Sequence, residues 1–230
     1  MKYILLISFI ATLVSCQTKK QKPEDRNNYF EGTIELNITF ASRYPEVINN
    51  LKKTFGTKEI DYVGENGYFG REYIDSNNII LRKEIFRPDS LRFYSYSINS
   101  DTVFYIEGKE STGSNIIKIT KNSSYKILNH TVDRIELRAP QGNIGDTTFY
   151  IYTTYYNDVN YFINPLAYKH ILADNVEDIF SASPHITTGT VFQFGNLAAV
   201  TCTASRIIPS SVPDWRFDIP KNKILAKQSD

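Results

Sequence analysis

The chain contains 230 residues, of which 41% are hydrophobic, 22% charged and 13% aromatic. This composition is typical of a folded globular protein, and it excludes a wholly disordered, collagen-like or multi-span membrane chain. Basic residues number 26 and acidic residues 25. Because the chain has no large field of one sign, binding of nucleic acid is disfavoured.

Residues 1–15 have the pattern of a lipoprotein signal peptide. Lys2 precedes an apolar run over residues 3–14, which is shorter than the roughly 20 residues that a membrane-spanning helix needs. The run ends in Leu-Val-Ser-Cys at Cys16, which resembles the lipobox of bacterial lipoproteins. We therefore expect cleavage before Cys16 and attachment of lipid to its thiol. The alternative is a plain secretory signal with an incidental cysteine.

Residues 16–28 are expected to form the lipidated cysteine and a flexible linker. No aliphatic or aromatic residue occurs between Gln17 and Asn28, so this segment cannot join a core, and a flexible chain of its length reaches about 20 Å. Two or three acyl chains hold a protein stably on a membrane. Gln17 is not the aspartate that retains some lipoproteins in the inner membrane, which favours an outer-membrane address in a bacterial envelope.

Residues 29–230 are expected to form a single antiparallel β domain. Residues 33–40 alternate apolar and polar side chains, as a half-buried strand does, and residues 45–55 carry an apolar stripe that ends at Gly56, which predicts a short amphipathic helix. A second short helix is expected over 165–172. Further strands are expected over 68–74, 79–86, 91–98, 102–106, 116–120, 131–137, 147–156 and 191–208.

Two of the expected strands are apolar on both faces. In 147–156, Ile151 and Tyr155 alternate with Tyr150, Tyr152 and Tyr156, and 91–98 shows the same pattern. Such a sheet must meet helices on one side and its own curled edge or a ligand on the other. The sequence therefore predicts a mainly β (α+β) fold, with a strongly curved antiparallel sheet or half-barrel and one or two short helices packed on one face.

Several segments resemble a known group of proteins. These are Tyr-Phe-Glu-Gly-Thr-Ile-Glu at 29–35, Tyr-Lys-Ile-Leu-Asn-His at 125–130, Arg-Ile-Glu-Leu at 134–137 and the closing segment 212–220. They are similar to Bacteroidetes-type lipoproteins of unknown function with a LolA-like (lipoprotein-carrier-like) half-barrel. The resemblance implies a curved sheet and an envelope address.

Catalytic and metal-binding patterns are not found in the sequence. His130, His170 and His185 show no paired spacing, so neither a metal site nor a cofactor is expected. Cys202 lies in an apolar run with no histidine near it, which predicts a buried core residue, and with Cys16 lipidated no intramolecular disulfide is available. No nucleophile, base and orienting group can be assembled from motifs, and we expect the protein not to be an enzyme.

The aromatic excess, with 16 tyrosines and 14 phenylalanines, has two interpretations. Core packing accounts for most of it. In the second interpretation Tyr94, Tyr96, Tyr150 and Tyr152 line a concavity that holds an apolar ligand such as an acyl chain. We therefore expect a membrane-anchored, non-catalytic envelope lipoprotein that binds a lipid or another apolar ligand. The alternative is a structural or protein-interaction module of the envelope with no small-molecule ligand.

Overall fold

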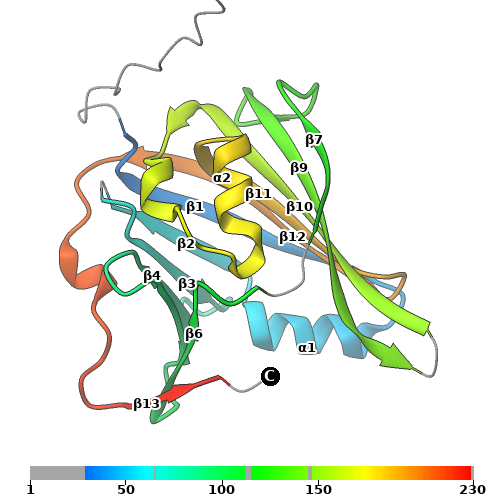
Figure 1. The fold of residues 1–230 in the computed structure, drawn as a ribbon. Coiled ribbons are helices and arrows are strands. Elements are labelled where there is room, and N and C mark those ends of the chain that lie inside the picture. Colours follow the sequence, from blue (N-terminus) through cyan, green and yellow to red (C-terminus); the bar gives the residue numbers. More distant parts are fainter. Residues whose placement is uncertain (1–28, 65, 112–114, 145–146, 229–230) are drawn as a thin grey trace, which may run out of the picture.

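The computed structural model describes residues 29–64, 66–111, 115–144 and 147–228 (Figure 1). The expected signal peptide (1–15), the lipidation site Cys16 and the linker (16–28) lie outside the described residues. Among the described residues, no helix is both long and apolar enough to cross a bilayer.

The described chain is mainly β, with one large, curved and unclosed sheet (Figure 1). This confirms the expected fold class. The strands follow one another across the sheet in the order β13-β6-β5-β4-β3-β2-β1-β12-β11-β10-β9-β7, and the short β8 pairs with β9. Their bounds are β1 (Gly32–Ser42), β2 (Lys58–Val63), β3 (Phe69–Ile74), β4 (Ile80–Arg87), β5 (Arg92–Ser97), β6 (Thr102–Glu107), β7 (Asn115–Thr120), β8 (Lys126–Ile127), β9 (His130–Ile144), β10 (Thr147–Phe162), β11 (His185–Phe194), β12 (Ala198–Pro209) and β13 (Ile224–Lys227).

The central strand β1 shows why the sheet has an inner face. Ile34, Leu36 and Ile38 are buried in the main hydrophobic cluster, whereas Asn37 and Thr39 between and beyond them are exposed. β1 pairs antiparallel with β12 on one side and with β2 on the other. Alternation therefore puts one face of the sheet in the core, as the sequence predicts.

Helix α1 (Pro45–Phe55) forms as expected. Pro45 occupies the start of the helix, where its missing N–H costs nothing, and Gly56 ends it with a φ of 68° that favours glycine. The ring of Phe55 meets Tyr73 of β3 edge to face at 5.7 Å and stacks on Phe192 of β11 at 6.5 Å. The helix therefore closes one end of the concave face.

The second helical region differs from the expected 165–172. Only the 3-10 turn η1 (Pro165–Tyr168) falls there, with the Asn164 side chain accepting a hydrogen bond from the Leu166 N–H at 3.1 Å. A further turn, η2 (Ala173–Asn175), leads into helix α2 (Val176–Ala182). The helix lies over the concave face of the sheet (Figure 1). Its Ile179 packs against Ile135 and Leu137 of β9.

Three strand assignments are corrected by the structure. The expected strand 191–208 is two strands, β11 and β12, separated by a turn in which Gly195 has a φ of 52°. β2 was not predicted, because it buries carboxylates where an apolar pattern is expected. β13 was not predicted either, and it pairs parallel with β6 in an otherwise antiparallel sheet.

The outer face of β2 to β6 is covered by the C-terminal segment of the chain. Val212, which precedes the turn η3 (Asp214–Phe217), and Phe217, its last residue, pack into a second hydrophobic cluster. The other buried members of this cluster are Tyr62, Ile85, Tyr94, Tyr96 and Val103. This outer cluster accounts for the second apolar face of β5, since the chain itself supplies the cover.

We expect Phe217→Ala to destabilise the protein by about 3–5 kcal/mol, because it empties the centre of the outer cluster. The Phe217 side chain is buried, and its ring lies 5.6 Å from that of Tyr68. Denaturant unfolding of the two proteins measures the difference. Trp215→Ala is the matched control, since Trp215 is 59% exposed and should cost little; equal losses in both variants would contradict this account of the outer face.

Candidate functional site: a cavity on the concave face

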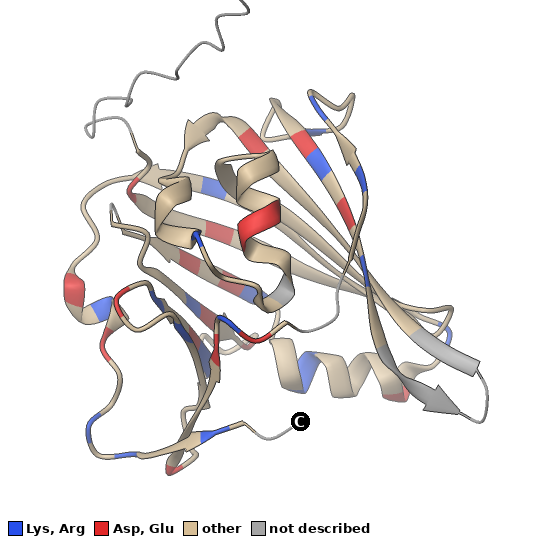
Figure 2. Ribbon diagram, in the orientation of Figure 1, with Lys and Arg blue, Asp and Glu red and all other residues tan. Residues whose placement is uncertain are grey.

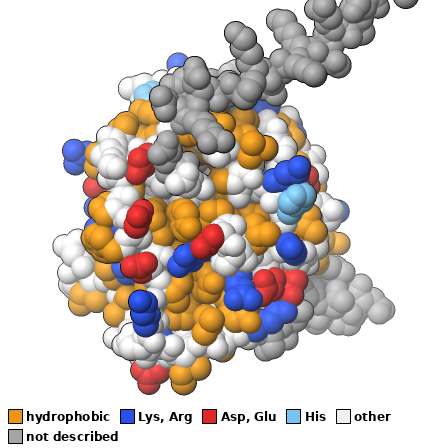
Figure 3. Space-filling view, turned by 60° about the vertical axis from the view of Figure 1, so that its left-hand side comes forward, with side chains coloured by type: hydrophobic (Ala, Val, Ile, Leu, Met, Phe, Trp, Pro, Cys, Tyr) orange, Lys and Arg blue, Asp and Glu red, His pale blue; other side chains and the backbone are white. Residues whose placement is uncertain are grey.

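A cavity of about 420 Å³ lies on the concave face, between the central strands and the η1–α2 segment. Its volume falls in the range of small-molecule sites. One lining residue, Phe104 of β6, is 45% exposed, which places an opening at the β6 end of the sheet. On the side of the molecule that carries β4, β6 and β13, hydrophobic side chains gather at the middle of the face, with charged side chains of both signs around and among them (Figure 3).

Most of the cavity wall is apolar and much of it is aromatic. Phe86 and Phe93 come from neighbouring strands, and Tyr168 and Phe180 come from η1 and α2 opposite. Their rings touch one another: Phe86 lies 4.7 Å from Phe93 and 5.6 Å from Tyr168, and Tyr168 lies 4.5 Å from Phe180. The other apolar lining residues are Ile34, Val63, Phe69, Ile85, Phe104, Ile106, Tyr155, Ile163, Val176 and Ile186.

Charged residues on β2, β3 and β4 form the polar end of the cavity. Figure 2 shows positions of both signs on these central strands. Arg71 donates two hydrogen bonds to Asp61, from Nε at 2.7 Å and from Nη2 at 2.8 Å, and its Nε also lies 3.1 Å from Glu59 Oε1. Arg82 pairs with Glu84 at 2.9 Å. We call these five residues the inner ion cluster; all but Glu59 line the cavity.

The inner ion cluster contains one more carboxyl group than it has guanidinium groups. Burial, together with the neighbouring charges of Asp61 and Glu84, raises the pKa of Glu59 to about 8 despite the attraction of Arg71. Burial also raises the pKa of Asp61, against the same guanidinium. Near neutral pH the Glu59 carboxyl therefore holds a proton, and the remaining charges of the cluster balance.

Cys202 of β12 is buried, as predicted. Burial raises the pKa of its thiol, and the neighbouring Glu59 adds to the effect. A thiol held protonated in this way is a poor nucleophile. Cys202 is therefore part of the packing behind the inner ion cluster.

The four tyrosines predicted to bind ligand do not meet at one place. Tyr94 borders the cavity, but its ring belongs to the outer cluster, where Tyr96 is also buried. Tyr150 is half-buried, with the Arg138 guanidinium 4.7 Å from its ring centre, and Tyr152 is 40% exposed. On β10 it is Tyr155, on the face opposite to Tyr150 and Tyr152, that lines the cavity.

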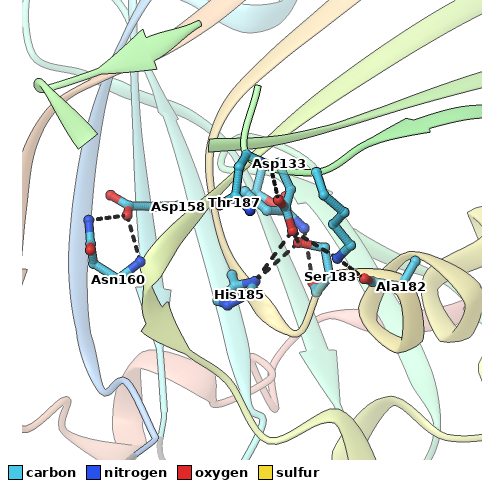
Figure 4. A network of polar contacts seen from close by, with 10 residues as sticks. Asp133, Asp158, Asn160, Ala182, Ser183, His185 and Thr187 are labelled. Carbon is cyan, nitrogen blue, oxygen red and sulfur yellow. Dashed lines mark hydrogen bonds and ion pairs between the residues drawn. The ribbon is translucent and has the colours of Figure 1, made fainter. Parts of the chain in front are cut away.

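A second polar network joins β9, α2 and β11 (Figure 4). The Ser183 hydroxyl donates to Asp133 at 2.8 Å and lies 3.2 Å from His185 Nδ1. Lys121 donates to Asp133 at 2.9 Å and to the Ala182 carbonyl. Because the Ser183 hydroxyl is directed at the carboxylate and is fully buried, this arrangement differs from a serine–histidine–aspartate relay. Its contacts fasten the C-terminal end of α2 to the sheet.

The electrostatics of this network fit a fastening role. Burial alone would raise the pKa of Asp133, but hydrogen bonds from Lys121, the Asn122 N–H and Ser183 outweigh burial and lower it. Burial lowers the pKa of His185, against the attraction of Asp133. Asp133 is therefore ionised and His185 neutral near neutral pH, so the network holds one ion pair and one neutral ring.

The other two histidines, His130 and His170, lie apart from the network of Asp133, Ser183 and His185. His130 Nδ1 lies 2.6 Å from Asp158 Oδ2, and Asp158 in turn accepts from the Asn160 N–H at 3.0 Å (Figure 4). His170 is exposed, and its backbone N–H donates to Glu177. In the described ranges, no group of three or more histidine, cysteine, aspartate or glutamate side chains is placed to hold a metal ion.

The sequence does contain a signal for the inner ion cluster in the spacing of its charged residues. Glu59 and Asp61 are two positions apart, as are Arg82 and Glu84, so each pair shares one face of its strand. Alternation alone does not tell which face is buried, since polar neighbours such as Lys83 and Glu72 occupy the opposite face. Only the pairing of β2, β3 and β4 shows that these charges face inward.

No protein-family model matches the chain, and no curated protein is significantly similar to it in sequence.

We expect Glu59→Gln to change the pH dependence of stability. The folded protein holds a proton on Glu59 that the unfolded chain releases above about pH 4.5, so stability of the wild type falls as pH rises toward 8. Glutamine has the same shape and does not ionise. Between about pH 5 and 9, the free energy of unfolding of the variant should exceed that of wild type by on the order of 2–4 kcal/mol.

Denaturant unfolding at several pH values measures this gain. Glu46→Gln, at an exposed position in the first turn of α1, is the matched control and should follow the wild-type profile. A Glu59→Gln profile parallel to that of wild type would contradict the buried, protonated carboxyl.

Proposed function

We propose that the protein is a membrane-tethered, non-catalytic binding protein that holds an apolar or amphiphilic small molecule in the concave-face cavity. The observation that carries the proposal is the cavity itself, about 420 Å³ with a largely apolar wall. Close packing normally leaves few voids larger than a water molecule in a protein interior. A space of this size, with an opening to solvent at Phe104, is therefore better explained by a ligand than by imperfect packing.

The architecture supports the same proposal. α1 and the η1–α2 segment cover the two ends of the concave face, while the sheet between them curves and does not close (Figure 1). The outer face of the same strands is sealed by the C-terminal segment. A ligand can thus reach one face of β2 to β6 only, the one that carries the inner ion cluster.

The envelope address rests on the N-terminal sequence. The proposed lipid on Cys16 and the linker to residue 28 would hold the domain about 20 Å from the membrane surface, near a source of apolar molecules. The resemblance to LolA-like lipoproteins supports the same address. The outer membrane is the proposed location, since Gln17 follows the cysteine.

An interaction module of the envelope is the second candidate function. The observation that favours it is the outer face, where the protein's own side chains fill the space that a ligand would otherwise need. This candidate requires the inner cavity to take up no small molecule. The two candidates are therefore separated by a binding measurement.

We expect Ser95→Phe to abolish binding of a small apolar probe, because Ser95 lines the cavity from β5 and the added ring would fill part of it. Binding of phenylpropanol to the full-length protein in lipid nanodiscs can be measured by calorimetry, with empty nanodiscs subtracted. Ser97→Phe is the matched control, two residues along the same strand and exposed, and it should bind as wild type does. If phenylpropanol, phenylpropylamine and phenylpropionate all fail to bind to the wild type, the result favours the interaction module.

We expect Cys16→Ala to prevent lipid attachment. Cells fed an alkyne analogue of palmitate should label the wild-type protein and not the variant. Cys202→Ala is the control that keeps the label. Equal labelling of wild type and Cys16→Ala would show that the segment is an ordinary secretory signal.

A further inference from the structure

We propose that the ligand of the cavity is an apolar organic cation, whose ammonium group sits at the inner ion cluster and whose hydrophobic body lies among the aromatic rings. This inference rests on the proposed function, since it concerns the same cavity. It is carried by two independent features of the wall: its charge balance and its aromatic content.

The charge balance comes first. Three carboxyl groups, Glu59, Asp61 and Glu84, share two guanidinium groups. The ion pairs of the cluster are internal: Arg71 with Asp61, with Glu59 and, at 4.0 Å, with Glu84, and Arg82 with Glu84. The uncharged polar neighbours are the Tyr73 hydroxyl, 3.4 Å from Glu84 Oε2, and the buried Cys202 thiol behind Glu59. When all three carboxyl groups are ionised the cluster therefore carries one surplus negative charge, which an added positive charge would balance; the buried Nε–H of Arg82 also has no hydrogen-bond partner among the described residues.

The position of each carboxyl indicates where the cation would lie. Asp61 and Glu84 both line the cavity. The Asp61 and Glu59 side chains are 2% exposed and pair closely with Arg71, whereas the Glu84 side chain is 32% exposed and lies 4.0 Å from Arg71 Nη1. Glu84 is thus the carboxylate that a ligand can reach. The Nη2 of Arg82 is already held by Glu84 at 2.9 Å, and its guanidinium lies over the Tyr73 ring, 4.3 Å from the ring centre.

The aromatic wall favours the same class of ligand. The faces of phenylalanine and tyrosine rings carry partial negative charge and attract cations, most strongly when water is excluded. Phe69 and Phe93 line the cavity from the strands that carry or adjoin the inner ion cluster, and Phe180 lines it from α2. A wall of aliphatic side chains would hold an alkyl body equally well without this preference for a cation.

Binding of a cation should release a proton. In the free protein the surplus carboxyl of the cluster is protonated, and an ammonium group at Glu84 supplies the positive charge that lets Glu59 ionise. The balance is one cation bound for one proton passed to solvent. Affinity should therefore rise with pH up to about 8, the pKa of Glu59 in the free protein, and level off above it, while an alkylamine itself stays protonated.

Three probes with one aromatic body test the charge preference: phenylpropylamine, phenylpropanol and phenylpropionate, each titrated into the full-length protein in nanodiscs with empty nanodiscs subtracted. We expect the amine to bind about ten-fold more tightly than the alcohol, and the carboxylate more weakly than either. Titration in two buffers of different ionisation enthalpy should show proton release with the amine and none with the alcohol. Equal affinity of amine and alcohol overturns the inference and leaves the proposed function standing.

Two variants locate the cation. Glu84→Gln should reduce amine affinity about ten-fold and leave the alcohol unchanged, while Glu59→Gln, which removes the surplus carboxyl, should abolish both the proton release and the rise of amine affinity with pH. Glu35→Gln, which lies on β1 and pairs with Lys58, is the matched control and should bind as wild type does. Amine binding that is insensitive to Glu84→Gln in a variant that unfolds like wild type overturns the inference, because the charge would then be recognised elsewhere.

Discussion

The bidentate pair between Arg71 and Asp61 is the interaction on which the concave face depends. A carboxylate as deeply buried as Asp61 is costly unless a positive charge meets it directly, and removing one partner of such a pair leaves the other uncompensated. Arg71 meets both Asp61 and Glu59, which joins β2 to β3 from the inside. An interior built in this way cannot collapse onto itself as an apolar core would, because its polar end must stay in contact with its partners or with solvent.

The two apolar faces of the central strands have different covers, and this difference explains why the cavity occurs on one of them. The outer face meets a continuous piece of chain, in which Val212 and Phe217 pack in one cluster with the tyrosines of β2 and β5. The inner face meets α1 and α2, two short helices that approach from opposite ends of the sheet (Figure 1). Because the sheet curves away between them, side chains cannot fill the middle.

The sequence predicted most of the sheet, and its failures have physical causes. Alternating patterns identified strands such as β1, and Pro45 with Gly56 correctly bounded α1. The pattern did not predict β2, because buried carboxylates take the places of the apolar residues of an ordinary strand. The turn at Gly195 lies within a long, largely apolar segment, so the pattern predicted one strand in place of two. Helix α2 is too short to show helical periodicity. The candidate site was harder still: alternation identified residues that share a face, as Tyr94 shares one with Tyr96, but the choice of inner face is made by pairing across strands far apart in the chain.

The surplus carboxyl also distinguishes a binding role for the inner ion cluster from a purely structural one. If Glu59 only supplied an acceptor to Arg71, glutamine of the same shape would supply it too, without the loss of stability that ionisation brings as pH rises. Only a group that can lose its proton is able to adjust the charge of the cluster when a ligand arrives. In the proposed site Glu59 performs this adjustment from behind Arg71, out of reach of solvent, while Glu84 faces the cavity and makes the contact.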